Sequence, residues 1–589
     1  MKKIGKEQVR KARQTLAKYK EGKAVLDKRI VSNEQWWKLR HWGEIGYDKD
    51  DTRPMPASAW LFNSLANKHA DAMDNIPEPA VLPREKSDEE VAKQLSLILP
   101  AILERCGYEK LYSDGWWYKL KNGSMCTAVV WDPDADGGMG DIAIRNADIL
   151  NLFWEPGIKD IEESANLFYV TLVDRERLNL MYPELLGEDT ESVAGGTENV
   201  EKYKTEDKTD DSAKIEVVDW YYKKTINGRK QLCYCKFCGD RVIYSSEDDE
   251  SCADGFYKHS RYPFVMDTLF VQEGTPCGFG YIDVMRDAQM YIDKLSQVVL
   301  EHTVKMSRKR YFIRQNSAVN EAEFADLKNR FVHVAGNLGE EDIREIKAEP
   351  LDSSVMNALS LKIDELKETS GNRDFSQGSV SNGVTAASAI AALQEASGRS
   401  SRASTQSAYR AYARLIRMVI ERIRQFYDLP RKFRILGAGG AEEYVSYCNA
   451  HLKAQSLGAD GLLRTPVFDV TVTTQKHTEY TKLAQNELAL QFFQLGFFRP
   501  GMEQQALACL DMMDFDGKEQ VLQKIRGGTQ DALWQRMALT LAQRYEPELF
   551  ASLTDSAQGM RADVRLEGEK APAQVRQARK RAAEAAQPE

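Results

Sequence analysis

The sequence predicts an α+β fold, in which helical blocks and strand blocks follow one another along the chain. Apolar residues recur at helical spacing in 58–76, 88–105 and 281–304. The alternating period of strands dominates 107–174, 215–223, 231–244 and 431–475. Two helices enclose a small basic insert at 308–350. A compact enzyme core has little use for this layout, which favours a stalk around a hole.

The composition is that of an ordinary soluble protein, with 42% hydrophobic and 29% charged residues among 589. This length predicts roughly three to five domains. No apolar run reaches the ~18–20 residues that cross a bilayer. The basic start MKKIGKEQVRKARQ is followed by no apolar stretch, so we interpret it as a helix start and not as a leader. The net charge of −9 argues against an extensive grip on DNA.

The first 45 residues are expected to be helical and to end in the cluster Trp36, Trp37 and Trp42. Aromatic residues at this density predict buried contact with another segment or subunit. Further on, Asn122-Gly123 predicts a β-hairpin between two strands. The polar stretch 186–214 is expected to be a mobile loop.

An apolar stripe at helical spacing runs along 281–304 and predicts a buried seam. Its members include Tyr281, Val284, Met285, Tyr291, Leu295 and Val298. A basic cluster follows where this helix meets the insert, formed by Lys305, Arg308, Lys309, Arg310 and Arg314. For one chain the cluster is a solvated face, whereas in a closed ring it would repeat as a basic collar.

A second helix is expected at about 354–369, and a flexible polar loop at 371–385. The loop is nearly uncharged, because Arg373 and Asp374 partly offset each other. A third helix from about Ala386 to Tyr427 begins with Ala and Ser and continues with arginines. These are Arg410, Arg414, Arg417, Arg422 and Arg424.

Catalytic motifs are absent from the sequence. The glycine cluster GAGGAEE at 437–443 lacks the Lys-Ser/Thr of a phosphate-binding loop, and neither HExxH nor GxSxG occurs. We therefore expect no enzyme and no cofactor, with zinc as the one exception to weigh. Any motor that acts with this protein must bring its own ATPase.

The cysteines in CYCKFCG are the strongest indication of a metal. A CxxC pair followed by glycine can direct two thiolates at one zinc ion, and a fourth ligand would come from Cys252, His259 or Cys277. The site would then contain Cys233, Cys235, Cys238 and Cys252. A strand with small buried thiols explains the same residues, and no second CxxC exists.

Over about 58–480 the chain resembles the portal proteins of tailed bacteriophages. The resemblance rests on the order of several segments. These are SAWLFNSLANKHADAMDNIPEP, CTAVVWDPDADGGMGDIAIRNADILNLFWEPG, GFGYIDVMRDAQMYIDKLSQVVLEH and SGNRDFSQGSVSNGVTAASAIAALQEAS. It implies a portal-type fold with an α/β wing, a two-helix stem, a small α/β clip, a long wing or channel helix and a helical crown.

The resemblance assigns parts to the chain as follows. The implied bounds are an N-terminal helical segment at 1–45, wing at 46–277 and 429–477, stem helices at 278–307 and 353–370, clip at 308–352, tunnel loop at 371–386, long helix at 387–428, crown at 478–556 and a charged tail at 557–589. The tunnel-loop residues expected near DNA are Arg373, Asp374, Ser376, Gln377, Ser379 and Asn382. The stem stripe would face neighbouring subunits.

The resemblance also implies a function and partners. The protein would form a ring, commonly of twelve subunits, at a capsid vertex of the virion after assembly in the host cytoplasm. Double-stranded DNA would pass through it without sequence specificity, packaged by the terminase large subunit and later ejected. The major capsid protein, scaffold and a head-completion or adaptor protein would be further partners, and no membrane is involved.

A different class of function stays open at this point. The chain could be a zinc-containing protein that binds or processes nucleic acid, with the cysteines as its metal site and the arginine-rich third helix on DNA. The acidic balance argues against it, since tight binding of the DNA backbone usually requires net positive charge. A conduit must instead bind the DNA backbone weakly, because many contacts to phosphate would stop the DNA from moving through it.

Overall fold

The computed structural model describes residues 4–45, 53–183, 214–226, 228–307, 311–313, 320–325, 332–336, 343–345, 350–371, 399–436, 442–453, 455–456 and 463–474, with a few residues between 491 and 510. The chain divides into two compact units, Met1–Lys476 and His477–Glu589. All elements below belong to the first unit. Its mixture of helices and small antiparallel sheets confirms the α+β class.

A five-stranded antiparallel sheet is covered on one face by the long helix α1 (Lys6–Trp37). Its strands, in spatial order, are β4 (Leu152–Phe153), β5 (Asn166–Asp174), β6 (Lys214–Ile226), β7 (Arg229–Cys238) and β8 (Arg241–Ser245). Val9 and Leu16 of α1 lie in one buried cluster with Phe168 and Phe237 of the sheet. Burial of this apolar face stabilises α1. Most of its charged residues are exposed, while Lys23 and Asp27 are buried and pair with each other at 2.9 Å.

A second sheet, β3-β2-β9, joins distant parts of the chain. It contains β2 (Ser124–Asp132), β3 (Asp141–Asn146) and β9 (Phe264–Thr268). Helices α4 (Tyr108–Asn122) and α10 (Arg399–Phe426) pack against it. Leu415, Ile416 and Val419 of α10 are almost fully buried there. The long helix is therefore a core element of this unit.

Smaller strand pairs complete the body beside α10. β1 (Pro77–Pro83) pairs with β16 (Phe468–Thr474), which joins residues nearly four hundred positions apart. The other pairs are β12 (Arg431–Leu436) with β13 (Glu442–Tyr447), and β14 (Gln455–Ser456) with β15 (Leu463–Arg464). Helix α3 (Glu89–Arg105) packs on β1 and β12, and α5 (Arg175–Met181) follows β5.

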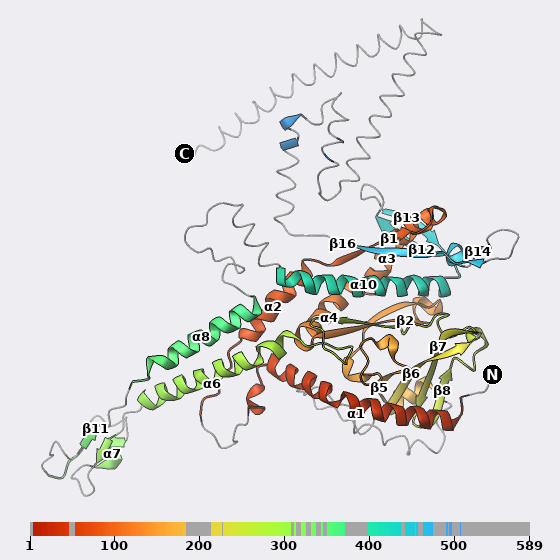
Figure 1. The fold of residues 1–589 in the computed structure, drawn as a ribbon. Coiled ribbons are helices and arrows are strands. Elements are labelled where there is room, and N and C mark those ends of the chain that lie inside the picture. The colour runs from red at the N-terminus through yellow and green to blue at the C-terminus, as the bar shows by residue number, and fades with distance from the viewer. Residues whose placement is uncertain are drawn as a thin grey trace, which may run out of the picture. The chain divides into compact units, whose positions relative to one another are not determined.

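Two helices leave the body side by side and form an arm (Figure 1). They are α6 (Tyr281–Ser307) and α8 (Ser353–Ser370), with α2 (Trp60–Met73) packed at their base. The far end of the arm carries β10 (Tyr311–Ile313), paired with β11 (Ile343–Glu345), and α7 (Glu321–Ala325). Among the described helices, none is long and apolar enough to cross a membrane.

The predicted hairpin at Asn122-Gly123 is wrong. α4 ends at Asn122, and Gly123 caps it in the left-handed conformation (φ 83°), donating its N–H to the Lys119 carbonyl at 2.8 Å. The missed signal was helical, since Tyr108, Tyr112 and Trp116 recur every four residues and are buried. β2 pairs instead with β3 and β9.

Other expectations about the elements have mixed outcomes. The predicted strand 231–244 is two strands, because the chain reverses between β7 and β8 at Gly239 (φ 56°).

Trp36 and Trp42 are buried against the chain itself, which confirms their predicted contact with another segment. The described part of the third helix, α10, is helical as expected. Most of 186–214 lies outside the described residues.

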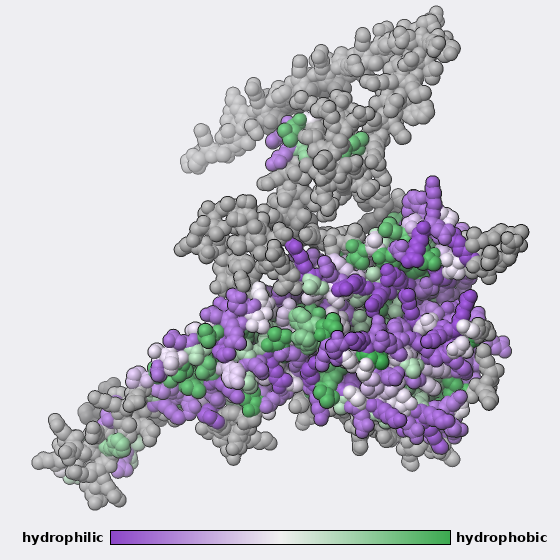
Figure 2. Space-filling model, in the orientation of Figure 1, coloured by the Kyte–Doolittle hydropathy of each residue, from purple (hydrophilic) through white to green (hydrophobic). Residues whose placement is uncertain are grey.

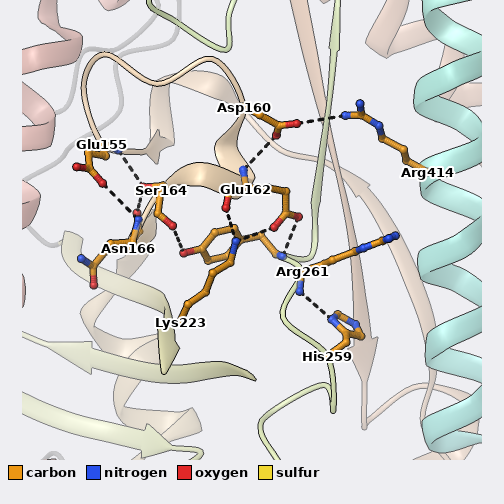
Figure 3. Close-up of polar contacts among 11 residues, drawn as sticks. Glu155, Asp160, Glu162, Ser164, Asn166, Lys223, His259, Arg261 and Arg414 are labelled. Atoms are coloured by element: carbon orange, nitrogen blue, oxygen red, sulfur yellow. Dashed lines mark hydrogen bonds and ion pairs between the residues drawn. The ribbon is translucent and has the colours of Figure 1, made fainter. Parts of the chain in front are cut away.

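A polar network links the connection 155–166 to strand β6 and to helix α10 (Figure 3). Glu162 accepts a hydrogen bond from Lys223 of β6 at 2.8 Å and another from the Tyr262 backbone at 3.1 Å. Asp160 reaches Arg414 of α10 at 3.7 Å. These contacts hold the connection against both β6 and α10.

A buried ion pair joins α4, β9 and α10. Lys119 Nζ lies 2.7 Å from Asp267 Oδ2, and both side chains are almost completely buried. Lys119 also donates to the Ser404 carbonyl at 3.2 Å, while Ser407 Oγ donates to Asp267 at 3.0 Å. Each charge thus has additional polar partners, and these partners offset the free-energy cost of burying an ion pair.

We expect Lys119→Met to destabilise the protein by about 3–5 kcal/mol, because Asp267 would remain buried without its counter-charge. Urea unfolding followed by tryptophan fluorescence would measure the loss. Lys110→Met, at an exposed lysine of the same helix, is the matched control and should change stability by less than about 0.5 kcal/mol. Equal effects of the two substitutions would contradict the assignment.

Candidate assembly surface on the arm

The N-terminal turns of α6, which we call its root, are packed in the hydrophobic core of the body. Tyr281 is 7% exposed and Met285 is 1% exposed, and Ile282 and Ile292 are fully buried. All four lie in the main hydrophobic cluster with residues of α2, α4 and α10. The first turns of α6 are therefore held by their own chain.

Another face of α6 carries apolar side chains that the described chain leaves in solvent. Val284, Tyr291 and Val298 are 43%, 48% and 45% exposed and follow one another at seven-residue intervals. Such an interval keeps side chains on one side of a helix. Further exposed apolar residues of the arm are Leu300, Val304 and Met306 of α6 and Met356 and Leu361 of α8.

The contact between α6 and α8 does not cover these side chains. In α8 the buried residues are Leu366 and Ser370, both at the end near the body. Lys362 Nζ lies 5.7 Å from the Tyr291 ring centroid and also pairs with Glu365 at 2.6 Å. On the face drawn in Figure 2, hydrophobic side chains lie among polar ones along the arm. An apolar surface of this kind is typical of a protein contact site.

The predicted stripe on 281–304 thus divides into two groups. Tyr281 and Met285 are buried by their own chain, and Leu295 is partly buried. Val284, Tyr291 and Val298 are the members that remain accessible to a partner. The prediction missed Leu300, Val304, Met306, Met356 and Leu361, and 300 and 304 do not follow the spacing of the stripe.

Of the predicted basic collar, the structure describes Lys305 only, whose side chain is 72% exposed and pairs with Glu301 at 2.7 Å. Arg308, Lys309, Arg310 and Arg314 lie outside the described residues. At the end of the arm, the Tyr311 and Phe324 rings meet edge to face at 5.0 Å, and Phe312 is 64% exposed.

The predicted loop residues Arg373, Asp374, Ser376, Gln377, Ser379 and Asn382 all lie outside the described residues. The same holds for nearly all of 478–556 and for the tail 557–589.

The cysteines predicted as zinc ligands are not gathered into a site. Cys233, Cys235 and Cys238 are buried in β7, where Cys235 faces the α1 cluster and Cys238 lies in a different cluster with Val217. Burial raises the pKa of Cys233 and Cys238 to about 11, which favours the neutral thiol over the zinc-binding thiolate.

The fourth predicted ligand, Cys252, lies near Tyr244 Oη with an Sγ–Oη distance of 3.8 Å. In the part of the chain that the structure describes, no group of three or more His, Cys, Asp or Glu side chains could hold a metal ion. The alternation of a strand places Cys235 and Cys238 on opposite faces, and this is the physical reason that the zinc prediction fails.

The arginines of the third helix are only partly available to a partner. Arg422 is fully buried, with its guanidinium 3.2 Å from the Tyr257 ring centroid and 2.9 Å from His259 Nε2. Arg424 pairs with Glu421 at 2.6 Å. Arg410, Arg414 and Arg417 are exposed. The arrangement does not support an arginine-rich helix devoted to DNA.

We expect the β7 cysteines to behave as inert core residues. At pH 8 a pKa of about 11 leaves roughly one thiol in a thousand ionised, so iodoacetamide should modify native protein far more slowly than guanidinium-unfolded protein. Metal analysis should find less than about half an equivalent of zinc. One equivalent of tightly held zinc would contradict this account.

Comparison with protein-family models matches residues 70–585 to the phage P22-like portal protein, which covers most of the chain. No curated protein matches it. The resemblance seen in the sequence is thereby confirmed. Portal proteins are a structural family, and membership implies a ring oligomer at a capsid vertex of the virion, with capsid and terminase partners. The chain belongs to the P22-like family of phage portal proteins.

Proposed function

We propose that the protein is a non-enzymatic DNA conduit whose ring is held together partly by the apolar face of the α6–α8 arm. The exposed stripe Val284, Tyr291 and Val298 carries this proposal. In a ring, each arm lies beside a copy of itself, and a heterologous contact of this kind closes when the rotation between copies closes. Twelve subunits is the number we propose.

The parts of the chain take their roles from this arrangement. The arm is the stem, with 278–307 and 353–370 as its helices, and 308–352 is the clip at its end. Residues 46–277 and 429–477 form the wing, 387–428 the long helix and 478–556 the crown. The first unit supports the stem and wing assignment, because α6 and α8 leave a body of sheets that is crossed by α10 (Figure 1).

We assign the clip to the docking of partners. The terminase large subunit would dock there during packaging, and a head-completion or adaptor protein afterwards. The basic residues Lys305, Arg308, Lys309, Arg310 and Arg314 would form a repeated collar toward an acidic partner or phosphate. The exposed Lys305 supports this placement. The capsid and scaffold proteins would contact other parts of the subunit, which assembles in the host cytoplasm.

Residues 371–386 are proposed as the tunnel loop. Gly371 ends α8 in the left-handed conformation (φ 71°), so the helix does not continue into the proposed loop. The following residues are polar and nearly uncharged, so they would touch double-stranded DNA without sequence specificity and without holding it. Arg373, Asp374, Ser376, Gln377, Ser379 and Asn382 are the residues that we place near DNA.

We expect the double substitution Tyr291→Glu and Val298→Glu to prevent ring formation. Half-exposed side chains contribute on the order of 1 kcal/mol each when an interface covers them, and a carboxylate there would be desolvated. Native mass spectrometry would show monomer in place of the ring, while circular dichroism would show unchanged helix content. Rings formed normally by the double variant would exclude this face from the interface.

The matched control for this experiment is the pair Tyr291→Phe and Val298→Ile. Both changes keep the apolar character and nearly the volume of the side chains. Rings of the original mass are expected, so that a failure of the glutamate variant reports on polarity at this face and not on substitution itself.

Deletion of 374–384 should leave the mass of the ring unchanged and impair DNA packaging or retention, because the loop would no longer reach the DNA. The measurement is the amount of nuclease-protected DNA per particle. A deletion of the same length in the polar stretch 186–214 serves as control and should package normally. Normal packaging by the 374–384 deletion would show that the loop is only a linker.

A further inference from the structure

Residues 29–45 and 53–58, which precede the family match beginning at residue 70, lie along the root of α6. This segment contains the end of α1, the short helix η1 (His41–Gly43) and the described residues 53–58. Its side chains and carbonyls bind one face of α6. The α6 residues involved are Asp283, Arg286, Gln289, Asp293 and Gln297.

The centre of this contact is a buried carboxylate. Asp293 Oδ2 lies 2.9 Å from His41 Nε2, and both side chains are 0% exposed. Asp293 Oδ1 accepts the Ser58 backbone N–H at 2.9 Å. Gln289 Nε2 donates to Asp293 Oδ2 and to the Ser58 carbonyl, each at 2.9 Å. A carboxylate in a dry site depends on such partners, so this geometry is strongly constrained.

Further contacts surround the carboxylate on both sides along α6. Toward the body, Asn33 Nδ2 donates to Asp283 Oδ1 at 3.0 Å. Arg286 Nη2 donates at 3.1 Å to Glu44, which also accepts from Trp36 Nε1 at 3.1 Å. Away from the body, Gln297 Nε2 donates to the Pro54 carbonyl at 3.0 Å.

The Trp36 ring connects these contacts to the core. It stacks on the His41 ring with centroids 4.3 Å apart, and it is 1% exposed within the main hydrophobic cluster. The segment is therefore anchored in the body at one end while its polar groups hold α6. Displacing it would expose the tryptophan and leave Asp293 without His41 and Ser58, so the two effects oppose displacement together.

Burial along α6 ends at Gln297, which donates to Pro54 of this segment. The buried residues of the helix run from Tyr281 to Gln297, and every described residue from Val298 to Ser307 is partly or fully exposed. Beyond Gln297 the helix is accompanied by α8. Among the described residues, the support of α6 thus changes within one turn, from several surrounding elements to the neighbouring helix α8.

We infer that residues 29–45 and 53–58 are a brace that makes the body and α6 one rigid piece as far as Gln297, so that the arm bends only beyond this residue. Asp293 and His41 are positioning residues in it. The brace sets the direction in which the accessible stripe of the arm faces. The inference rests on the contacts within one chain and does not require the proposed ring to be correct.

Hydrogen exchange of the unassembled full chain, followed by mass spectrometry, tests the brace. In the original protein, amide protection should fall by about tenfold or more between 281–297 and 298–307. Asp293→Ala should accelerate exchange in 281–297 by about tenfold or more, while β5, β6 and β7 change by less than about twofold. Asp287→Ala, at an exposed acid of the same helix, should leave both regions unchanged.

Two results would overturn the inference. One is an equal acceleration in α6 and in the sheet, which would mean that Asp293 supports the whole unit and not a local joint. The other is unchanged exchange in 281–297. Should Asp293→Ala not fold, Glu44→Ala removes only the partly exposed outer contact, and it must accelerate exchange in 281–297 by about threefold for the brace to stand.

Discussion

A pair of helices that projects from a body can bury side chains only along the line where the helices touch. This constraint governs the arm of α6 and α8. Near the body, α2, α4 and the N-terminal segment also pack against α6. They bury Ile282, Met285 and Ile292. Beyond Gln297 no such surfaces are described, and Val298 remains exposed, while Val284 and Tyr291 are exposed on the side of α6 that these elements leave uncovered. The proposed ring follows from the need to cover them.

The body that carries the arm is built from pairings between distant segments. β1 pairs with β16, and β2 pairs with β9, while α10 packs over the latter sheet. Buried charges at these junctions have specific partners, as Lys119 has Asp267 and Asp293 has His41. A unit held by long-range contacts and paired buried charges resists local opening, and this suits a support that must keep an arm in a fixed direction.

The N-terminal segment shows how a part outside a family match can be integral to the fold. Its α1 supplies the apolar cover of the five-stranded sheet through Val9 and Leu16, and its last turns reach the root of α6. The net charge of α1 is basic on a chain with a formal charge of −9, and ion pairs such as Lys20–Glu216 add to its hydrophobic contact with the body.

The sequence by itself determined the class of the fold, the helices predicted at 58–76, 88–105 and 281–304, the enclosed insert and the resemblance to portal proteins, because helical periodicity and segment order are local properties. It could not separate Tyr281 and Met285 from Val284 and Tyr291, since one apolar stripe can face either the chain's own core or a partner. It misassigned Asn122-Gly123, because this dipeptide suits a helix end as well as a hairpin. Only the tertiary structure decided these cases, and it also separated the β7 cysteines, because burial and strand pairing depend on which distant segments meet.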